Sequence, residues 1–176
     1  MRLIWSRRIH RDVRIYFYPG RLIMLPIKKI VCPTDFSEPA DEGLKIAREL
    51  AIQFSAEILL VHVVVPIPAM HGGAAPTGFH IPAVLEELEG SARNSLAEIR
   101  REKLPAEIKA RPNVILGRPA HEIVALAERE MADIIVIATQ GESGWQRFVF
   151  GSVAEKVVRH ADCPVLTVRA PNQEEK

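Results

Sequence analysis

The sequence predicts an α/β fold in which a five-stranded parallel sheet carries helices on both faces, a doubly wound arrangement. Two observations predict it. Short apolar runs alternate along the chain with segments of helical periodicity. The runs are also rich in β-branched residues, as expected of strands that helices cover on both faces. A chain of 176 residues is most simply one domain, and strand–helix alternation within one domain is typical of a parallel sheet.

Five apolar runs are expected to form the strands. They occupy residues 28–32, 57–65, 109–116, 134–139 and 164–169. Each of the first four runs is followed by apolar residues at helical spacing, which predict one helix between each pair of successive strands. In an open parallel sheet, ligands bind beyond the carboxyl ends of the strands, where the strand order reverses. The loops that follow the strands are therefore the places to look for a site.

The loop after the fourth strand contains Gly141 and Gly144, and it ends at Gly151 and Ser152, where a helical pattern begins. A glycine-containing loop between a strand and a helix brings free backbone N–H groups to a helix N-terminus, an arrangement that suits a phosphate anion. Ser152 is expected to supply a capping hydroxyl. The alternative is a connection whose glycines only serve turns.

The first strand runs into Pro33, Thr34 and Asp35, which lie at the same edge of the predicted sheet. The Asp35 carboxylate could accept hydrogen bonds from a ribose or a base, or it could cap the next helix. Ser37 suits the capping role better, because Pro39 and the helical periodicity follow it closely. Asp35 is therefore expected to remain available to a ligand.

Three segments together carry a resemblance to a known family. They are the opening Pro33-Thr34-Asp35-Phe36-Ser37, the tripeptide Gly117-Arg118-Pro119 and the run Gly151-Ser152-Val153-Ala154-Glu155. From about residue 25 to residue 170 the chain resembles the universal stress protein family of the nucleotide-binding type. The nucleotide motif of that family is Gly, two residues, Gly, nine residues, then Gly-Ser or Gly-Thr. Gly141, Gly151 and Ser152 match it, whereas Ala138 stands in place of the first glycine.

The resemblance implies strand order 3-2-1-4-5 and ATP as the ligand, with Mg²⁺ on its phosphates. Val63 and Ile137 would contact the adenine through their backbones, and Asp35 would hold the ribose or the base. The phosphates would bind backbone N–H groups and the hydroxyl of Ser152. The residues that supply these groups would be Gly141, Gly144, Gly151, Ser152 and Val153. Pro33, Thr34 and Ala138 complete the expected site. No residue is assigned a catalytic or a metal-ligating role.

Two other functions stay open at this point. The first is an enzyme that hydrolyses ATP slowly or phosphorylates itself. The sequence shows no general base and no Walker lysine, and Arg147 is the nearest candidate cation for a γ-phosphate. The second is a family member that binds no nucleotide and acts through a dimer surface, for which Ala138 is the sequence support.

The chain is expected to divide into a basic extension at 1–24, the domain at 25–170 and a polar tail at 171–176. Residues 1–23 hold six arginines and one acidic residue, although the whole chain has a net charge of only +1. The extension could be a transit peptide or a nucleic-acid arm. We favour an unstructured segment or one that lies upstream of a natural start at Met24, with no partner strand in the sheet.

The remaining expectations concern location and partners. No apolar run approaches the ~20 residues of a membrane-spanning helix, and the net charge gives no reason to expect a nucleic acid. Cys32 and Cys163 lie at opposite edges of the predicted sheet, so we expect no disulfide and a reducing, cytoplasmic compartment. The last strand begins at Pro164 and ends at Arg169. It is expected to be an edge strand that pairs with its own copy in a homodimer.

Overall fold

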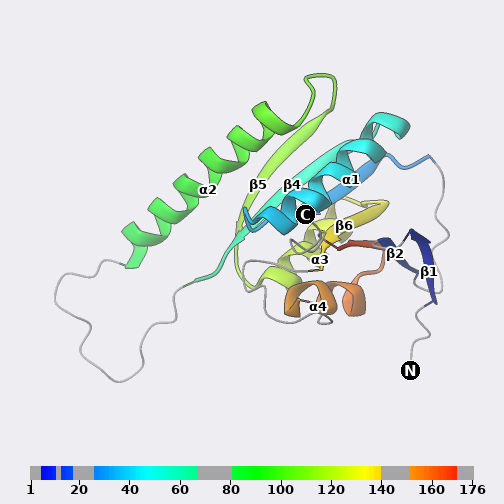
Figure 1. The fold of residues 1–176 in the computed structure, drawn as a ribbon. Coiled ribbons are helices and arrows are strands. Elements are labelled where there is room, and N and C mark those ends of the chain that lie inside the picture. The colour runs from blue at the N-terminus through cyan, green and yellow to red at the C-terminus, as the bar shows by residue number, and fades with distance from the viewer. Residues whose placement is uncertain (1–4, 11–12, 18–25, 67–80, 140–150, 170–176) are drawn as a thin grey trace, which may run out of the picture.

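The computed structural model describes residues 5–10, 13–17, 26–66, 81–139 and 151–169. Its centre is a sheet with strand order β1-β2-β7-β6-β3-β4-β5 (Figure 1). The strands are β1 (Trp5–His10), β2 (Val13–Phe17), β3 (Lys29–Pro33), β4 (Glu57–Val64), β5 (Ala110–Leu116), β6 (Ile134–Ala138) and β7 (Val165–Val168). The helices are α1 (Glu38–Phe54), α2 (Ile81–Lys103), α3 (Pro119–Arg129) and α4 (Ser152–His160).

The strands β5, β4, β3, β6 and β7 are all parallel. Numbered along the chain from β3, their order is 3-2-1-4-5, which confirms the predicted fold class and topology. One helix connects each pair of successive strands in this set. The chain runs from β3 outward through β4 to β5 and then returns to β6, on the other side of β3, so the order reverses between β3 and β6.

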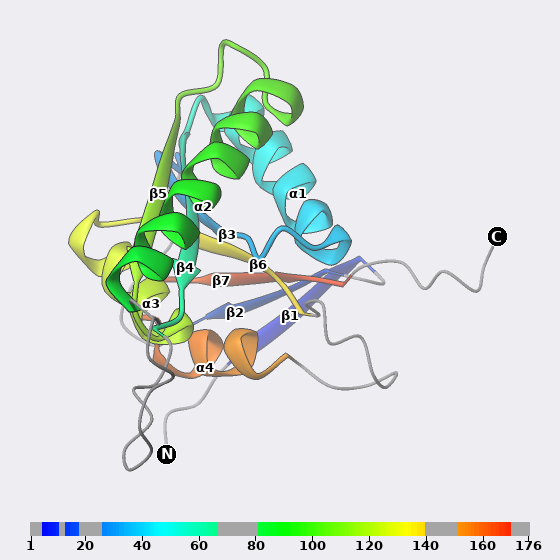
Figure 2. The same cartoon turned by 90° about the vertical axis from the view of Figure 1, so that its left-hand side faces the viewer.

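Helices α1 and α2 cover one face of the sheet, and α3 and α4 cover the other (Figure 2). Alternate residues of the parallel strands enter the two cores, as the two-residue period of a strand requires. In β3, Ile30 packs with α1 and α2, whereas Val31 packs with α3 and α4. This double burial explains the nearly continuous apolar runs in the sequence. No helix in the described parts of the chain is both long and apolar enough to cross a membrane.

The central strands β3 and β6 pair over a short length. Their register joins Ile30 to Ile134 and Val31 to Ile135, whereas β3 and β4 stay paired as far as Pro33 and Val61. The two central strands therefore separate toward their carboxyl ends. This opening lies where the strand order reverses, which is where α/β sheets bind ligands.

The amino-terminal segment differs from the expectation. Strand β2 pairs antiparallel with β7, and β1 pairs antiparallel with β2. The expectation that this segment has no partner strand is therefore wrong for residues 13–17. The expectation that the last strand is an edge of the sheet is wrong for the same reason, since β2 lies against β7. Residues 13–17 read Val-Arg-Ile-Tyr-Phe, and such alternation of polar and apolar residues favours a strand.

Candidate functional site

A cavity of about 390 Å³ lies at the carboxyl ends of β3, β4 and β6. This volume falls within the usual range for small-molecule sites. The residues around it come from four parts of the fold: the turn after β3, the end of β4, the end of β6 and the first turns of the helices. They are Pro33, Thr34, Asp35, Ala40, Val61, His62, Val63, Pro119, Ile123, Ile137, Ala138, Thr139, Gly151, Ser152, Val153 and Ala154.

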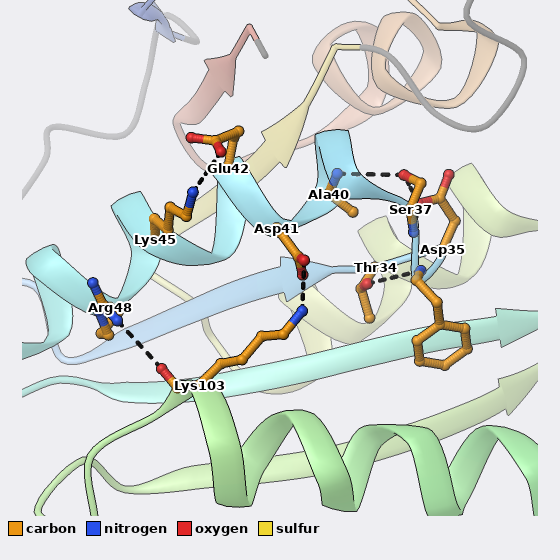
Figure 3. Close-up of polar contacts among 10 residues, drawn as sticks. Thr34, Asp35, Ser37, Ala40, Asp41, Glu42, Lys45, Arg48 and Lys103 are labelled. Carbon is orange, nitrogen blue, oxygen red and sulfur yellow. Dashed lines mark hydrogen bonds and ion pairs between the residues drawn. The ribbon is translucent and has the colours of Figure 1, made fainter. Parts of the chain in front are cut away.

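The turn after β3 is held by side chains that bond to their own backbone (Figure 3). Oδ1 of Asp35 accepts hydrogen bonds from the backbone N–H and the hydroxyl of Ser37. The Ser37 hydroxyl oxygen in turn accepts from the N–H of Ala40, 3.3 Å away, which confirms Ser37 as the N-cap of α1. Asp35 is thus only partly available to a ligand, because Oδ1 is engaged and Oδ2 has no hydrogen bond to any described residue.

Thr34 is buried within this turn, and each of its polar groups already has a partner. Its N–H donates to the Val61 carbonyl at 2.8 Å, and its hydroxyl oxygen accepts from the Phe36 N–H at 3.0 Å. Its carbonyl lies 2.9 Å from Nδ1 of His62. A carbonyl can only accept, so Nδ1 carries the proton in this contact. Thr34 therefore holds the shape of the site more than it offers groups to a ligand.

His62 also supports Phe36, which has a positive φ of 67°. The two rings are stacked with their centroids 4.3 Å apart. A positive φ is unfavourable for a bulky residue and persists only where its surroundings hold it. Those surroundings are the stacked His62 ring and the hydrogen bond that the Phe36 N–H donates to the Thr34 hydroxyl oxygen. His62 therefore helps to fix the turn that presents Asp35.

The backbone of Val63 faces the opening between the strands. In β4 the Val61 carbonyl bonds to the turn after β3, whereas the Val64 carbonyl accepts from Gly117 beyond β5. Because backbone groups alternate in direction along a strand, Val63 points to the same side as Val61. The strand β3 has already ended at that level, at Pro33. The N–H and C=O of Val63 are therefore directed into the cavity, and no strand among the described residues lies opposite them.

The same alternation separates the roles of Ile137 and Ala138 at the end of β6. The N–H groups of Ile135 and Thr139 donate to carbonyls next to and within β7. The backbone of Ile137 therefore faces β7, so what it presents to the cavity is its side chain. The backbone of Ala138 faces the opening between β6 and β3. A Cβ placed on Gly43 of α1 would lie 3.3 Å from the Ala138 nitrogen, so α1 packs closely against this strand end.

The opposite wall of the cavity is the N-terminus of α4. Gly151 is the N-cap, with no side chain to cap the helix, so the expectation of a Ser152 cap is wrong: Ser152 is the first helical residue. The Gly151 N–H donates to the Thr139 carbonyl at 2.6 Å, which ties the helix start to the end of β6. The first-turn N–H groups of Ser152, Val153 and Ala154 have no acceptor within the helix, and these residues line the cavity. The helix dipole adds a partial positive charge there.

The thiol of Cys32 lies beneath the site on β3 and is fully buried. Burial, with a smaller contribution from the negative charge of Asp41, raises its pKa to about 12. Cys32 and Cys163 are both buried, and neither forms a disulfide. Within the described residues, no group of three or more His, Cys, Asp or Glu side chains is arranged to hold a metal ion.

The cavity brings together every predicted site residue that the structure describes; Gly141 and Gly144 lie outside the described residues. Sequence reasoning missed several further lining residues, among them Ala40, Pro119 and Ile123. Pro119 and Ile123 belong to the first turns of α3, which follows β5. The rule that every loop after a parallel strand meets the same edge could have indicated them.

The comparisons with known proteins agree with this fold. The sequence profile of the universal stress protein family matches residues 26–169. The universal stress protein MJ0531 of Methanocaldococcus jannaschii is 36% identical over 147 residues, which make up 84% of this chain and 85% of that protein. The solved structure of MJ0577 from the same organism has a TM-score of 0.73 at 30% identity, over 84% of this chain and 99% of that one.

A universal stress protein from Archaeoglobus fulgidus, solved in complex with dAMP, has a TM-score of 0.54 at 24% identity. It covers 82% of this chain and 99% of its own length, and at this identity the likeness shows the fold alone. The family profile spans nearly all of the parallel sheet and its helices, and the relatives match over most of their own length. The chain belongs to the universal stress protein family.

Proposed function

We propose that this protein binds ATP in the cavity between β3 and β6 and serves as a nucleotide-dependent module in stress adaptation. One observation carries the proposal. A single cavity is surrounded by the carboxylate of Asp35, the N-terminus of α4 and the backbone of Val63, which faces no strand in the described part of the chain. These three features match the three parts of a nucleotide: a base edge, a sugar with hydroxyl groups and an anionic phosphate chain.

The adenine would lie against the end of β4. Its edge offers both a donor and an acceptor, and the N–H and C=O of Val63 are the complementary pair. The side chains of Ile137 and Ile123 supply an apolar surface for the ring. Oδ2 of Asp35, which has no hydrogen bond to any described residue, would accept from a ribose hydroxyl. Oδ1 would stay bonded to Ser37 and hold the carboxylate in place.

The phosphates would lie at the N-terminus of α4, where the N–H groups of Ser152, Val153 and Ala154 are without helical acceptors. Gly141 and Gly144, which lie outside the described residues, belong to the same proposed phosphate site. Mg²⁺ would be held by the phosphate oxygens and water, as is usual for this ion, because the described residues provide no dedicated ligand set.

The relatives support an adenine nucleotide as the ligand class, since the Archaeoglobus protein with the same fold was solved with dAMP. The buried thiols of Cys32 and Cys163, neither in a disulfide, fit the reducing conditions of the cytoplasm. Slow ATP hydrolysis or self-phosphorylation is the second candidate. The described residues that line the cavity include no lysine or arginine, the groups that stabilise a transferring phosphoryl. This observation favours binding over fast catalysis.

The proposal is tested by titrating the pure full chain with ATP in a calorimeter, with and without Mg²⁺. Asp35→Ala should weaken binding about tenfold or more, the worth of a hydrogen bond to a charged group. Asp41→Asn is the matched control, because Asp41 bonds to Lys103 on α2 and does not line the cavity. An absence of heat with ATP, and of any nucleotide released by heating the protein, would contradict the proposal. Release of labelled phosphate would identify the enzyme instead.

A further inference from the structure

The outer edge of β7 is occupied by the chain's own amino-terminal hairpin, β1 and β2. The register joins Val13 to Val168, Arg14 to Thr167, Ile15 to Leu166 and Tyr16 to Val165. In Figure 2 the two strands extend the sheet beyond β7. Without β2, the edge of the sheet would be β7, a short apolar strand of the kind that pairs with another chain.

The backbone directions show which residues make this contact. The carbonyls of Pro164 and Val168 accept hydrogen bonds from β6 and the residue after it. By alternation, the backbone groups of Val165 and Thr167 face the other way, toward β2. Their register partners are Tyr16 and Arg14. The backbone groups of Tyr16 and Arg14 are therefore the ones that close this edge.

The topology favours a hairpin that folds onto its own chain. Because β2 is antiparallel to β7, its last residue, Phe17, lies at the end of the sheet where β7 and β3 begin. The path from β2 to β3 crosses three strand spacings, about 14 Å. A chain reaches ~3.3 Å per residue, so about five residues would cover that distance. The segment 18–28 is longer than this, and the connection need not cross the length of the sheet.

We propose that the β1–β2 hairpin caps the edge of β7 within one chain and thereby excludes a second copy that would otherwise pair through β7. The three apolar residues of β7 are well suited to a two-fold antiparallel pairing, and they are buried in the capped structure together with Thr167. The hairpin and the second copy use the same backbone groups, those of Val165 and Thr167. Only one of them can be bound at a time.

The tether gives the hairpin a large advantage. A segment joined by a short linker acts at an effective concentration in the millimolar range. A second copy at ~10 μM, pairing equally well, is therefore outcompeted about a hundredfold. The new edge of the capped sheet is β1, which contains Arg7 and Arg8. Charged residues on an edge strand discourage pairing with further chains. The capped form should thus stay monomeric at this edge.

The experiment compares three full-length chains by light scattering over a dilution series from ~1 to ~500 μM. Arg14→Pro with Tyr16→Pro removes the two N–H donors that face β7. Arg14→Thr with Tyr16→Thr is the matched control, since threonine keeps both donors and favours strands. The wild type and the threonine variant should be monomeric through most of the series. The proline variant should dimerise with an apparent Kd lower by at least about tenfold, because in the wild type both copies must first release a hairpin held at a millimolar effective concentration.

Amide hydrogen exchange at Val165 and Thr167 gives a second readout. In the wild type their protection should not depend on protein concentration, because the cap is part of the same chain. In the proline variant, protection of these two amides should appear only as dimers form.

Three results would overturn the proposal. The first is a wild type that dimerises at ~10 μM. The second is amide protection at Val165 and Thr167 that falls when the wild type is diluted, as an exchange of hairpins between two copies would give. The third is a proline variant that stays monomeric at ~500 μM. A threonine variant that dimerises as strongly as the proline variant would remove backbone pairing as the cause. ATP affinity, measured on the same chains, should be unchanged, so the outcome is independent of the proposed nucleotide site.

Discussion

The imidazole of His62 donates a hydrogen bond to the carbonyl of Thr34. In a regular β3–β4 ladder, this carbonyl would accept the next hydrogen bond between the two strands. The Thr34 N–H donates to Val61, so the regular parallel pattern would continue with the Val63 N–H donating to the Thr34 carbonyl. Nδ1 of His62 is bonded there instead, at 2.9 Å. One side chain thus ends the ladder and leaves the Val63 N–H directed into the cavity.

The first prediction concerns this bond. His62→Leu should weaken ATP binding about tenfold and lower the free energy of unfolding by about 1–2 kcal/mol, because the buried Thr34 carbonyl loses its donor. His62→Asn should retain most of both, since an Asn amide can place a donor near the position of Nδ1. Calorimetric titration and urea unfolding measure the two quantities. Equal losses in the two variants would contradict a role for the hydrogen bond.

The second prediction concerns Gly151. A Cβ at this position would lie 3.0 Å from the Thr139 carbonyl oxygen, to which the Gly151 N–H is bonded. Gly151→Val should therefore displace the start of α4, lower the melting temperature and abolish measurable ATP binding. Gly90→Ala on α2 is the control, because a Cβ there would meet no described atom within 4 Å outside its chain neighbours and the adjacent backbone of its own helix. It should stabilise the protein by about 0.5–1 kcal/mol and leave ATP affinity unchanged.

The third prediction concerns Ser152, whose hydroxyl lies at the first position of α4 and does not cap it. Ser152→Ala should leave the melting temperature nearly unchanged. It should weaken ATP binding by about 1 kcal/mol, the usual worth of one neutral hydrogen bond. A large loss of stability with intact binding would show that the hydroxyl serves the fold and not the ligand.

The fourth prediction concerns the dependence of stability on pH. The pKa of Cys32 is raised from its ordinary value of 9.0 to about 12 in the folded protein. Between these values the unfolded chain loses the thiol proton while the folded chain keeps it. Stability should therefore fall as pH rises above 9, by up to about 1.4 kcal/mol per pH unit. Urea unfolding at several pH values should show this slope, reduced in Cys32→Ala. Identical slopes in the two proteins would refute the assignment.

Local signals in the sequence sufficed for the parts of the fold that depend on neighbouring residues. The apolar runs and their spacing gave the parallel strands, and Ser37 was recognisable as a cap because Pro39 and a helical pattern follow it. The position of the cavity followed from the rule for parallel sheets. The resemblance named Val63, but the direction of its backbone depends on where β3 ends, which only the register of two strands defines.

The features that sequence reasoning missed arise from contacts between distant segments. The hairpin pairs residues near position 15 with residues near position 166, and no local pattern specifies that partner. The interpretation of residues 1–23 relied on their arginines, although the alternation at 13–17 indicated a strand. The direction of the Ile137 backbone is likewise not readable from the local sequence, because the bonds of β6 to β7 determine which way its N–H points.

The short pairing of β3 with β6 has a thermodynamic consequence. Only two residue pairs join these strands, so the sheet has fewer backbone bonds at its centre than between β4 and β5. A nucleotide that contacts the Asp35 turn on one side and α4 on the other would connect the two halves of the molecule. Its binding energy would then oppose their separation, adding RT ln(1 + [L]/Kd) to the stability. Cellular ATP levels would thus set how readily this protein unfolds.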